Sequence, residues 1–121
     1  MHDPREHALV CKALRDGLGG CVEWAESGAN RVREDPDLRG LTPEFLKREV
    51  IAYIRSQEDS KVVQVKEERE PYRDRYRFYY KVILPMADFR HGIFIEMILT
   101  SDDDPDYPEV TLVNAHPQRR P

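Results

Sequence analysis

The sequence has no long hydrophobic run, and this absence argues against a membrane-spanning helix. No apolar stretch approaches the roughly 20 residues that a helix needs to cross a bilayer. The first ten residues show no signal-peptide pattern and are typical of helix-forming sequence instead. We therefore expect a cytoplasmic protein that makes no membrane contact.

Cysteine is scarce, and the chain contains only Cys11 and Cys21. Two cysteines without CxxC spacing cannot form a zinc site by themselves, so we expect small buried residues in a reducing compartment. The "GLGG" segment at 17–20 lacks the Lys and the Ser/Thr of a phosphate-binding loop. HExxH and GxSxG are also absent. A nucleotide-driven enzyme or a zinc protease is therefore not expected, and neither is a metal or another cofactor.

Basic residues are fewer than acidic ones, with 19 Lys and Arg against 23 Asp and Glu, so the formal net charge is −4. This balance argues against a general nucleic-acid binder. The charge is uneven, however, since residues 101–109 carry five acids and no base, whereas residues 69–91 carry six bases and three acids. The six bases are Arg69, Arg73, Arg75, Arg77, Lys81 and Arg90. The basic excess is therefore expected on one part of the fold.

Helical periodicity fills the first half of the chain. The segment "DPRE" at 3–6 is a helix start, with Asp as the cap and Pro at the first position. A second helix is expected from about 21 to 32. The strongest helix signal is "LTPEFLKREVIAYIRS" at 41–56, which begins with Thr42 as cap and Pro43 at the first position.

The second half changes to the period of two that is typical of strands. Four strands are expected: "KVVQVKEE" at 61–68, "RYRFYYKVIL" at 75–84, "GIFIEMILT" at 92–100 and "EVTLVNAH" at 109–116. Consecutive strands with connections of about eight to ten residues favour an antiparallel meander.

These patterns predict a single α+β domain over residues 1–121. Its helical half is 1–56 and its sheet half is 61–117. About three helices are expected to pack on one face of a curved antiparallel sheet of about four strands. The other face of the sheet is expected to be partly polar and open.

Four aspartates crowd the stretch "TSDDDPDYPEV", and they raise the question of a metal site. Asp and Pro are ordinary turn residues, and the glycine and the bidentate acid of a calcium loop are missing. A solvated turn is the favoured interpretation. A role in docking a partner stays open.

Hairpin geometry predicts a polar row across three strands. Lys81 is expected opposite Glu96, Glu96 near Asn114, and Phe94 near His116. Two interpretations stay open for this row. It is either a cross-strand ion pair beside an amide, or an acid–base site on a basic, aromatic sheet face.

The surroundings of the row bear on this choice. His116 is expected at the end of the sheet that also carries Arg90 and His91. The outward side of the strand at 75–84 adds basic and aromatic groups, namely Arg75, Arg77 and Tyr79. Both histidines and this basic face also have the simpler interpretation of ordinary loop and surface residues.

Helices followed by a curved antiparallel sheet with an open basic face resemble the RelE-type toxin fold. More broadly, the pattern is similar to the barnase, EndoU, colicin and RelE-like ribonucleases. The resemblance covers roughly residues 40–118. The residues that carry it are "RYRFYYK" at 75–81, "GIFIE" at 92–96 and "VTLVNAHP" at 110–117, the last being similar to the terminal strand of BrnT-like toxins.

The resemblance implies metal-independent cleavage of RNA by attack of a 2′-OH on the adjacent phosphate, and a cognate antitoxin that covers this face. His116 would be the first acid or base, with Glu96 or His91 as its counterpart. Phosphate and base contacts would come from Lys81, Arg75, Arg77, Tyr79, Arg90 and Asn114.

The main alternative is a non-enzymatic interaction module, such as an immunity-like, antitoxin-like or phage-derived accessory protein. In that case the acidic loop at 101–109 would be the working surface and would bind a basic partner.

Overall fold

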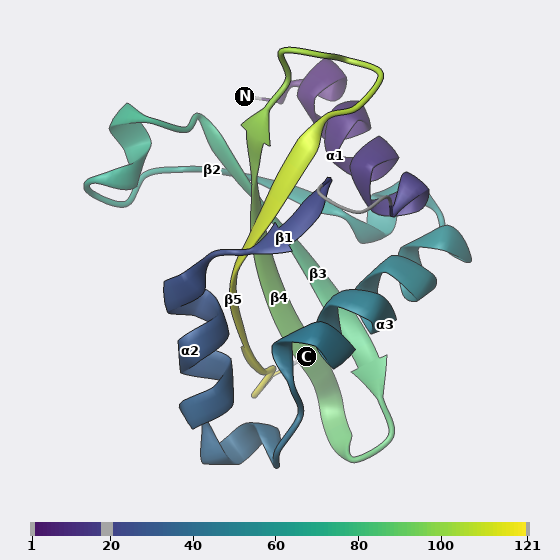
Figure 1. Cartoon of the computed structure of the whole chain (residues 1–121), viewed down its shortest axis with the longest axis vertical. Coiled ribbons are helices and arrows are strands. Elements are labelled where there is room, and N and C mark those ends of the chain that lie inside the picture. The colour runs from purple at the N-terminus through teal and green to yellow at the C-terminus, as the bar shows by residue number, and fades with distance from the viewer. Residues whose placement is uncertain (1, 18–20, 121) are drawn as a thin grey trace.

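Capping residues set the starts of two helices, as the sequence predicts. In the computed structural model, which describes residues 2–17 and 21–120, helix α1 is Pro4–Asp16 and helix α3 is Pro43–Arg55 (Figure 1). The side chain of Asp3 accepts a hydrogen bond from the Glu6 amide at 3.1 Å, and Thr42 accepts one from the Phe45 amide at 3.1 Å. Residues 18–20 of the "GLGG" segment lie outside the described residues.

The prediction of one helix over 21–32 is wrong. Strand β1, Val22–Trp24, occupies its start, and helix α2 is Glu26–Glu34. β1 pairs in parallel with strand β5, Glu109–Pro117, because the Val110 amide donates to Cys21 and the Ala25 amide donates to Leu112. A three-residue strand is too short to show a period of its own, so long-range pairing decides its conformation.

The sheet therefore has five strands and is mixed, not four-stranded and antiparallel. Its order is β1-β5-β4-β3-β2, and among the described residues only the β1–β5 pair is parallel. The remaining strands are β2 Val63–Lys66, β3 Phe78–Met86 and β4 Phe89–Ser101. Short 3₁₀ turns are η1 Pro36–Leu38, η2 Asp59–Lys61 and η3 Tyr72–Asp74. The α+β class and the three α-helices are confirmed.

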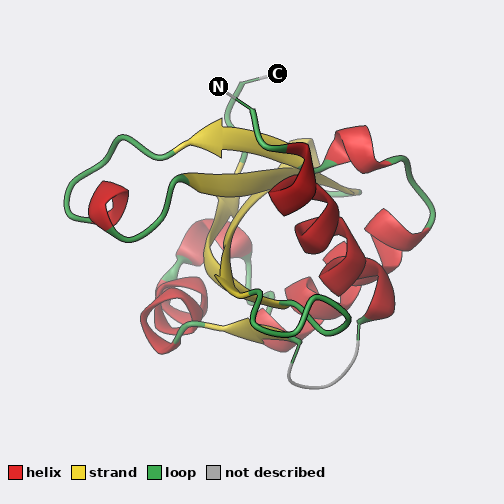
Figure 2. Ribbon diagram, turned by 90° about the horizontal axis from the view of Figure 1, so that it is seen from above, coloured by secondary structure: helices red, strands yellow, loops and turns green. Residues whose placement is uncertain are grey.

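The two faces of the sheet differ, as the alternation in β3 and β4 predicts. Inward side chains are buried in one core cluster with residues of α1 and α3, and Figure 2 shows these two helices on the same side of the sheet. The buried apolar side chains that β3 and β4 add to this core are Phe78, Tyr80, Val82, Leu84, Ile93, Ile95 and Met97. Among residues 2–17 and 21–120, no helix is long and apolar enough to span a bilayer.

Helix α2 adds Val32 to the same core cluster but lies at the β5 side of the sheet. It packs beside β5, where its Gly28 lies against the backbone of Val113. Residues 67–77, which we call the arm, connect β2 to β3 and project from the sheet (Figures 1 and 2). The Glu67 amide donates to Arg77 at 2.9 Å and closes the base of the arm. The arm and α2 thus flank the face that α1 and α3 leave open.

Candidate functional site

The predicted polar row is present on the open face. Lys81 of β3 is the cross-strand partner of Glu96 of β4, and Glu96 is the partner of Asn114 of β5. A bulge follows this point, because Met97 pairs with Leu112. Val113 is the extra residue of this bulge and lies beside α2. The pairing of β4 with β5 is therefore shifted by one residue beyond Glu96 and Asn114.

His116 lies two residues beyond Asn114 on β5, on the same face of the sheet. Its partner is Phe94, and the two rings stack with centroids 4.7 Å apart and an interplanar angle of 15°. Its Nδ1 lies 3.1 Å from the carbonyl oxygen of Pro117. Because a carbonyl can only accept, Nδ1 carries the proton in this contact, and Nε2 is the nitrogen left for proton exchange. Diagonal neighbours such as Glu96 and His116 have Cα atoms about 7–8 Å apart in an antiparallel pair.

The carboxylate of Glu96 is bound by Arg69 of the arm and not by Lys81. Arg69 Nη2 lies 2.8 Å from Glu96 Oε2, and Nη1 lies 3.3 Å from Oε1. Glu96 is only 7% exposed. Within the described chain, Lys81 has no carboxylate within ion-pair distance. The ammonium group of Lys81 is thus left for another anion.

Arg69 binds a second buried carboxylate. Its Nε and Nη2 donate to Glu67 at 2.9 and 2.8 Å, and its guanidinium lies 4.3 Å from the ring centroid of Tyr79. Hydrogen bonds from Arg69 hold the pKa of Glu67 below its ordinary value of 4.5, and the two carboxylates raise the pKa of Arg69. Burial raises the pKa of the Tyr79 phenol. The cluster Glu67–Arg69–Glu96 therefore joins the arm to the sheet.

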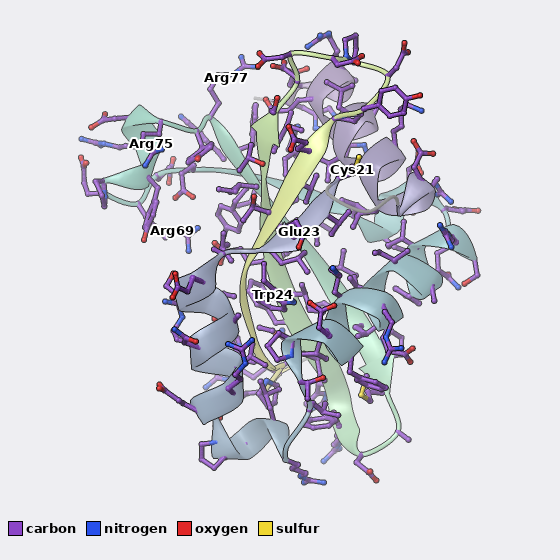
Figure 3. All side chains as sticks on the ribbon, in the orientation of Figure 1. Cys21, Glu23, Trp24, Arg69, Arg75 and Arg77 are labelled. Atoms are coloured by element: carbon purple, nitrogen blue, oxygen red, sulfur yellow. The ribbon has the colours of Figure 1, made fainter. Side chains whose placement is uncertain are left out.

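A hollow of about 290 Å³ lies over this cluster, between the arm and the start of α2, and we call it the arm hollow. Figure 3 shows Arg69 and Arg75 on the arm, on the side where α2 also lies. Glu67, Arg69 and Glu96 form part of its lining. The rest of its lining is mostly polar or aromatic: Ala25, Ser27, Arg31, Tyr72, Arg75, Tyr76, Ile98, Val113 and Asn114.

Three other predicted site residues lie elsewhere. Arg77 forms an ion pair with Asp3 and lies 3.6 Å from Glu6, so its charge is directed to α1 (Figure 3). Arg90 and His91 line a shallower hollow of about 710 Å³ at the β3–β4 turn, which we call the hairpin hollow. The structure thus groups Lys81, Glu96, Asn114, His116, Tyr79 and Arg75 on or beside the open face.

Sequence reasoning missed Arg69 and Arg31 as site residues. Arg69 is 27 positions from Glu96 and lies in an irregular arm, so no periodicity connects the two. Arg31 is 82 positions from Val113, the residue that its side chain contacts, so no local pattern connects it to the sheet. The only signal for Arg69 was its place between acids in "KEEREP".

The acidic stretch forms a turn closed by its own hydrogen bonds. The Asp106 amide donates to Asp104 Oδ1 at 3.0 Å, and the Tyr107 amide donates to the Asp104 carbonyl at 3.0 Å. Residues 102–107 are exposed. No group of three or more His, Cys, Asp or Glu residues in the described ranges is arranged to hold a metal ion. The hydrogen bonds and the exposure show a turn, as the favoured interpretation expects, and a role in docking a partner stays a prediction.

The two cysteines differ in their surroundings. Cys11 is 2% exposed, and burial raises the pKa of its thiol to about 12. This thiol is therefore a core group and not a nucleophile at neutral pH. Cys21 is half-buried, so the expectation of two buried cysteines holds fully only for Cys11.

Comparison with known proteins gives no guide to the activity. No family model, curated protein or solved structure matches this chain.

Proposed function

We propose that the open face of the sheet binds RNA and cleaves it without a metal ion. One observation carries the proposal. The strand register places Lys81 and Asn114 on either side of Glu96, and His116 follows on the same face. Aromatic and cationic groups beside this row, Tyr79 with Arg69 and then Arg75, suit the stacking and phosphate contacts of a single strand.

The chemistry needs one proton acceptor and one proton donor. Glu96 accepts the proton of a 2′-OH, whose oxygen forms a bond to the adjacent phosphorus as the bond to the 5′ oxygen breaks. The protonated ring of His116 gives its Nε2 proton to that leaving oxygen. Lys81 stabilises the extra negative charge on the phosphate oxygens. The products are a 2′,3′-cyclic phosphate and a 5′-OH.

Arg69 has a positioning role in this scheme. Its two hydrogen bonds hold both oxygens of Glu96 on the sheet, in the row with Asn114. The family resemblance also implies an antitoxin that covers this face. Such a partner would dock over the same row and block access of RNA to it.

Cleavage of a labelled RNA by the purified protein in EDTA tests the proposal. We expect His116→Ala to slow cleavage about 100-fold or more, because it removes the acid, and Lys81→Ala to slow it about tenfold or more. His2→Ala and Lys61→Ala are matched controls, since both side chains are exposed and lie away from the row. Equal rates for His116→Ala and wild type, or cutting only with added divalent metal, would contradict the proposal.

The acidic loop favours a second candidate, a module that binds a basic partner. Tyr107 is 58% exposed among four aspartates, which places an aromatic group inside an acidic surface. In this case we expect a lysine-rich peptide to bind wild type, and Asp103→Asn with Asp106→Asn to weaken binding about tenfold. Glu26→Gln with Glu34→Gln is the control, since both acids are exposed at the ends of α2. Equal weakening by both pairs would show only a net-charge effect.

A further inference from the structure

We propose that the arm hollow is a pocket for one phosphate-bearing nucleotide, held by Arg31 and Arg75. This inference rests on the proposed function, since it names the part of the RNA that the open face would read beside the cut. It also assigns a role to Arg31, which belongs to helix α2 and not to the strands that carry the polar row.

In the part of the chain that the structure describes, neither of these two arginines has a carboxylate within ion-pair distance. Both acids in its lining, Glu67 and Glu96, are bound by Arg69. Arg31 donates to the neutral carbonyl oxygen of Val113 at 2.7 Å, and this bond fixes the side chain without cancelling its charge. Arg75 packs over the ring of Tyr76, with 5.6 Å to the centroid. An anion at the mouth would therefore meet a guanidinium from α2 and another from the arm.

The remaining walls suit a sugar and a base. Tyr72 and Tyr76 bring aromatic rings to the walls of the hollow, and base stacking on such rings is tolerant of sequence. The amide of Asn114 and the hydroxyl of Ser27 supply donors and acceptors for a base edge or a ribose hydroxyl. A volume of about 290 Å³ lies at the small end of the range for ligand pockets, which suits a single nucleotide and not a folded RNA.

The position of the hollow connects it to the row. Glu96 and Asn114 belong both to the hollow and to the polar row. A nucleotide in the hollow would therefore direct the next phosphate of its strand over Lys81 and His116. The hollow would then select the residue on one side of the cut.

Titration of the full chain with adenosine 5′-monophosphate and uridine 5′-monophosphate, followed by amide chemical shifts, tests this pocket. Inorganic phosphate and the two nucleosides are the comparison ligands. We expect the nucleotides to bind at least about tenfold more tightly than either comparison, with shifts at the walls of the arm hollow. Arg31→Gln and Arg75→Gln should each weaken nucleotide binding about tenfold or more.

Two arginines provide matched controls. Arg33 lies on the same helix and bonds to Asn30, and Arg73 lies on the same arm and pairs with Glu70. Arg33→Gln and Arg73→Gln should leave nucleotide affinity within about twofold of wild type. Shifts confined to the hairpin hollow, or equal losses in test and control variants, would overturn the pocket.

The two proposals can fail separately. RNA cleavage with no nucleotide binding in the arm hollow would overturn this inference and leave the cleavage site standing. Nucleotide binding that depends on Arg31 and Arg75, together with no cleavage of RNA, would support the pocket and overturn the proposed ribonuclease activity.

Discussion

Replacing Arg69 by methionine is expected to lower the free energy of unfolding by about 3 kcal/mol near pH 7, the low end of the range for breaking a buried ion pair. The substitution keeps much of the side-chain length but leaves Glu67 and Glu96 without their cation. The side chains of these two acids are 2% and 10% exposed, so water replaces the lost hydrogen bonds only in part. We choose the low end of the range because the Arg69 side chain itself is 49% exposed.

The pH dependence of this variant should have the opposite sign to that of the wild type. In the wild type Arg69 lowers the pKa of Glu67, so this stabilisation is present above pH 4.5 and is lost as the pH falls through the lowered value. Without Arg69, burial disfavours the charged carboxylate of Glu67, and stability should rise as the pH falls from 7 to 5. Urea unfolding at pH 7 and pH 5 measures this rise in the variant, and unfolding below pH 4.5 measures the loss in the wild type.

Two further variants test the cause. Arg73→Met removes an exposed arm ion pair with Glu70 and should change stability by less than about 0.5 kcal/mol. Adding Glu67→Gln and Glu96→Gln to Arg69→Met should recover part of the loss, since no buried charge remains. A loss that is the same at both pH values, with no recovery, would show that the effect is packing alone.

Replacing Gly28 by alanine is expected to destabilise the protein by about 1–3 kcal/mol, the usual cost of overpacking. A Cβ at this position would lie 2.5 Å from the carbonyl oxygen of Val113 and 2.9 Å from its carbonyl carbon. These are backbone atoms, so they cannot move away by a change of rotamer. Helix α2 would have to shift away from β5 to relieve the contact.

The direction of this effect is informative because helix propensity points the other way. Alanine is favoured over glycine by about 1 kcal/mol in a helix interior. Asn30→Ala on the same helix is the control, since Asn30 is exposed and its substitution should leave stability equal or slightly higher. Thermal unfolding compares the two variants, and a Gly28→Ala protein more stable than wild type would refute the close contact between α2 and β5.

The sequence determines the sheet register well because two physical constraints act together. Apolar residues at every second position fix which side of β3 and β4 faces the core, and a one-residue slip would reverse every side chain. The short connection between β3 and β4 then leaves one register that pairs Lys81 with Glu96, and it is the register observed. The prediction of Asn114 beside Glu96 succeeds in the same way.

What the sequence did not reveal depends on contacts between distant segments. β1 forms because Cys21 and Ala25 find backbone partners on β5, and nothing within three residues encodes that pairing. The same holds for Arg69, whose arm has no regular period but folds back to reach Glu96. The bases between 69 and 91 were expected to share one surface, yet Arg77 is directed to α1 and Arg90 to the hairpin hollow.

The chemical ends that the protein leaves on RNA in EDTA test the central claim most directly. Attack by the 2′-OH predicts a 2′,3′-cyclic phosphate on one product and a 5′-OH on the other, both lost in His116→Ala. Products with a 3′-OH and a 5′-phosphate would contradict this chemistry, because they require water as the nucleophile. RNA left intact by the folded wild-type protein would contradict the ribonuclease itself.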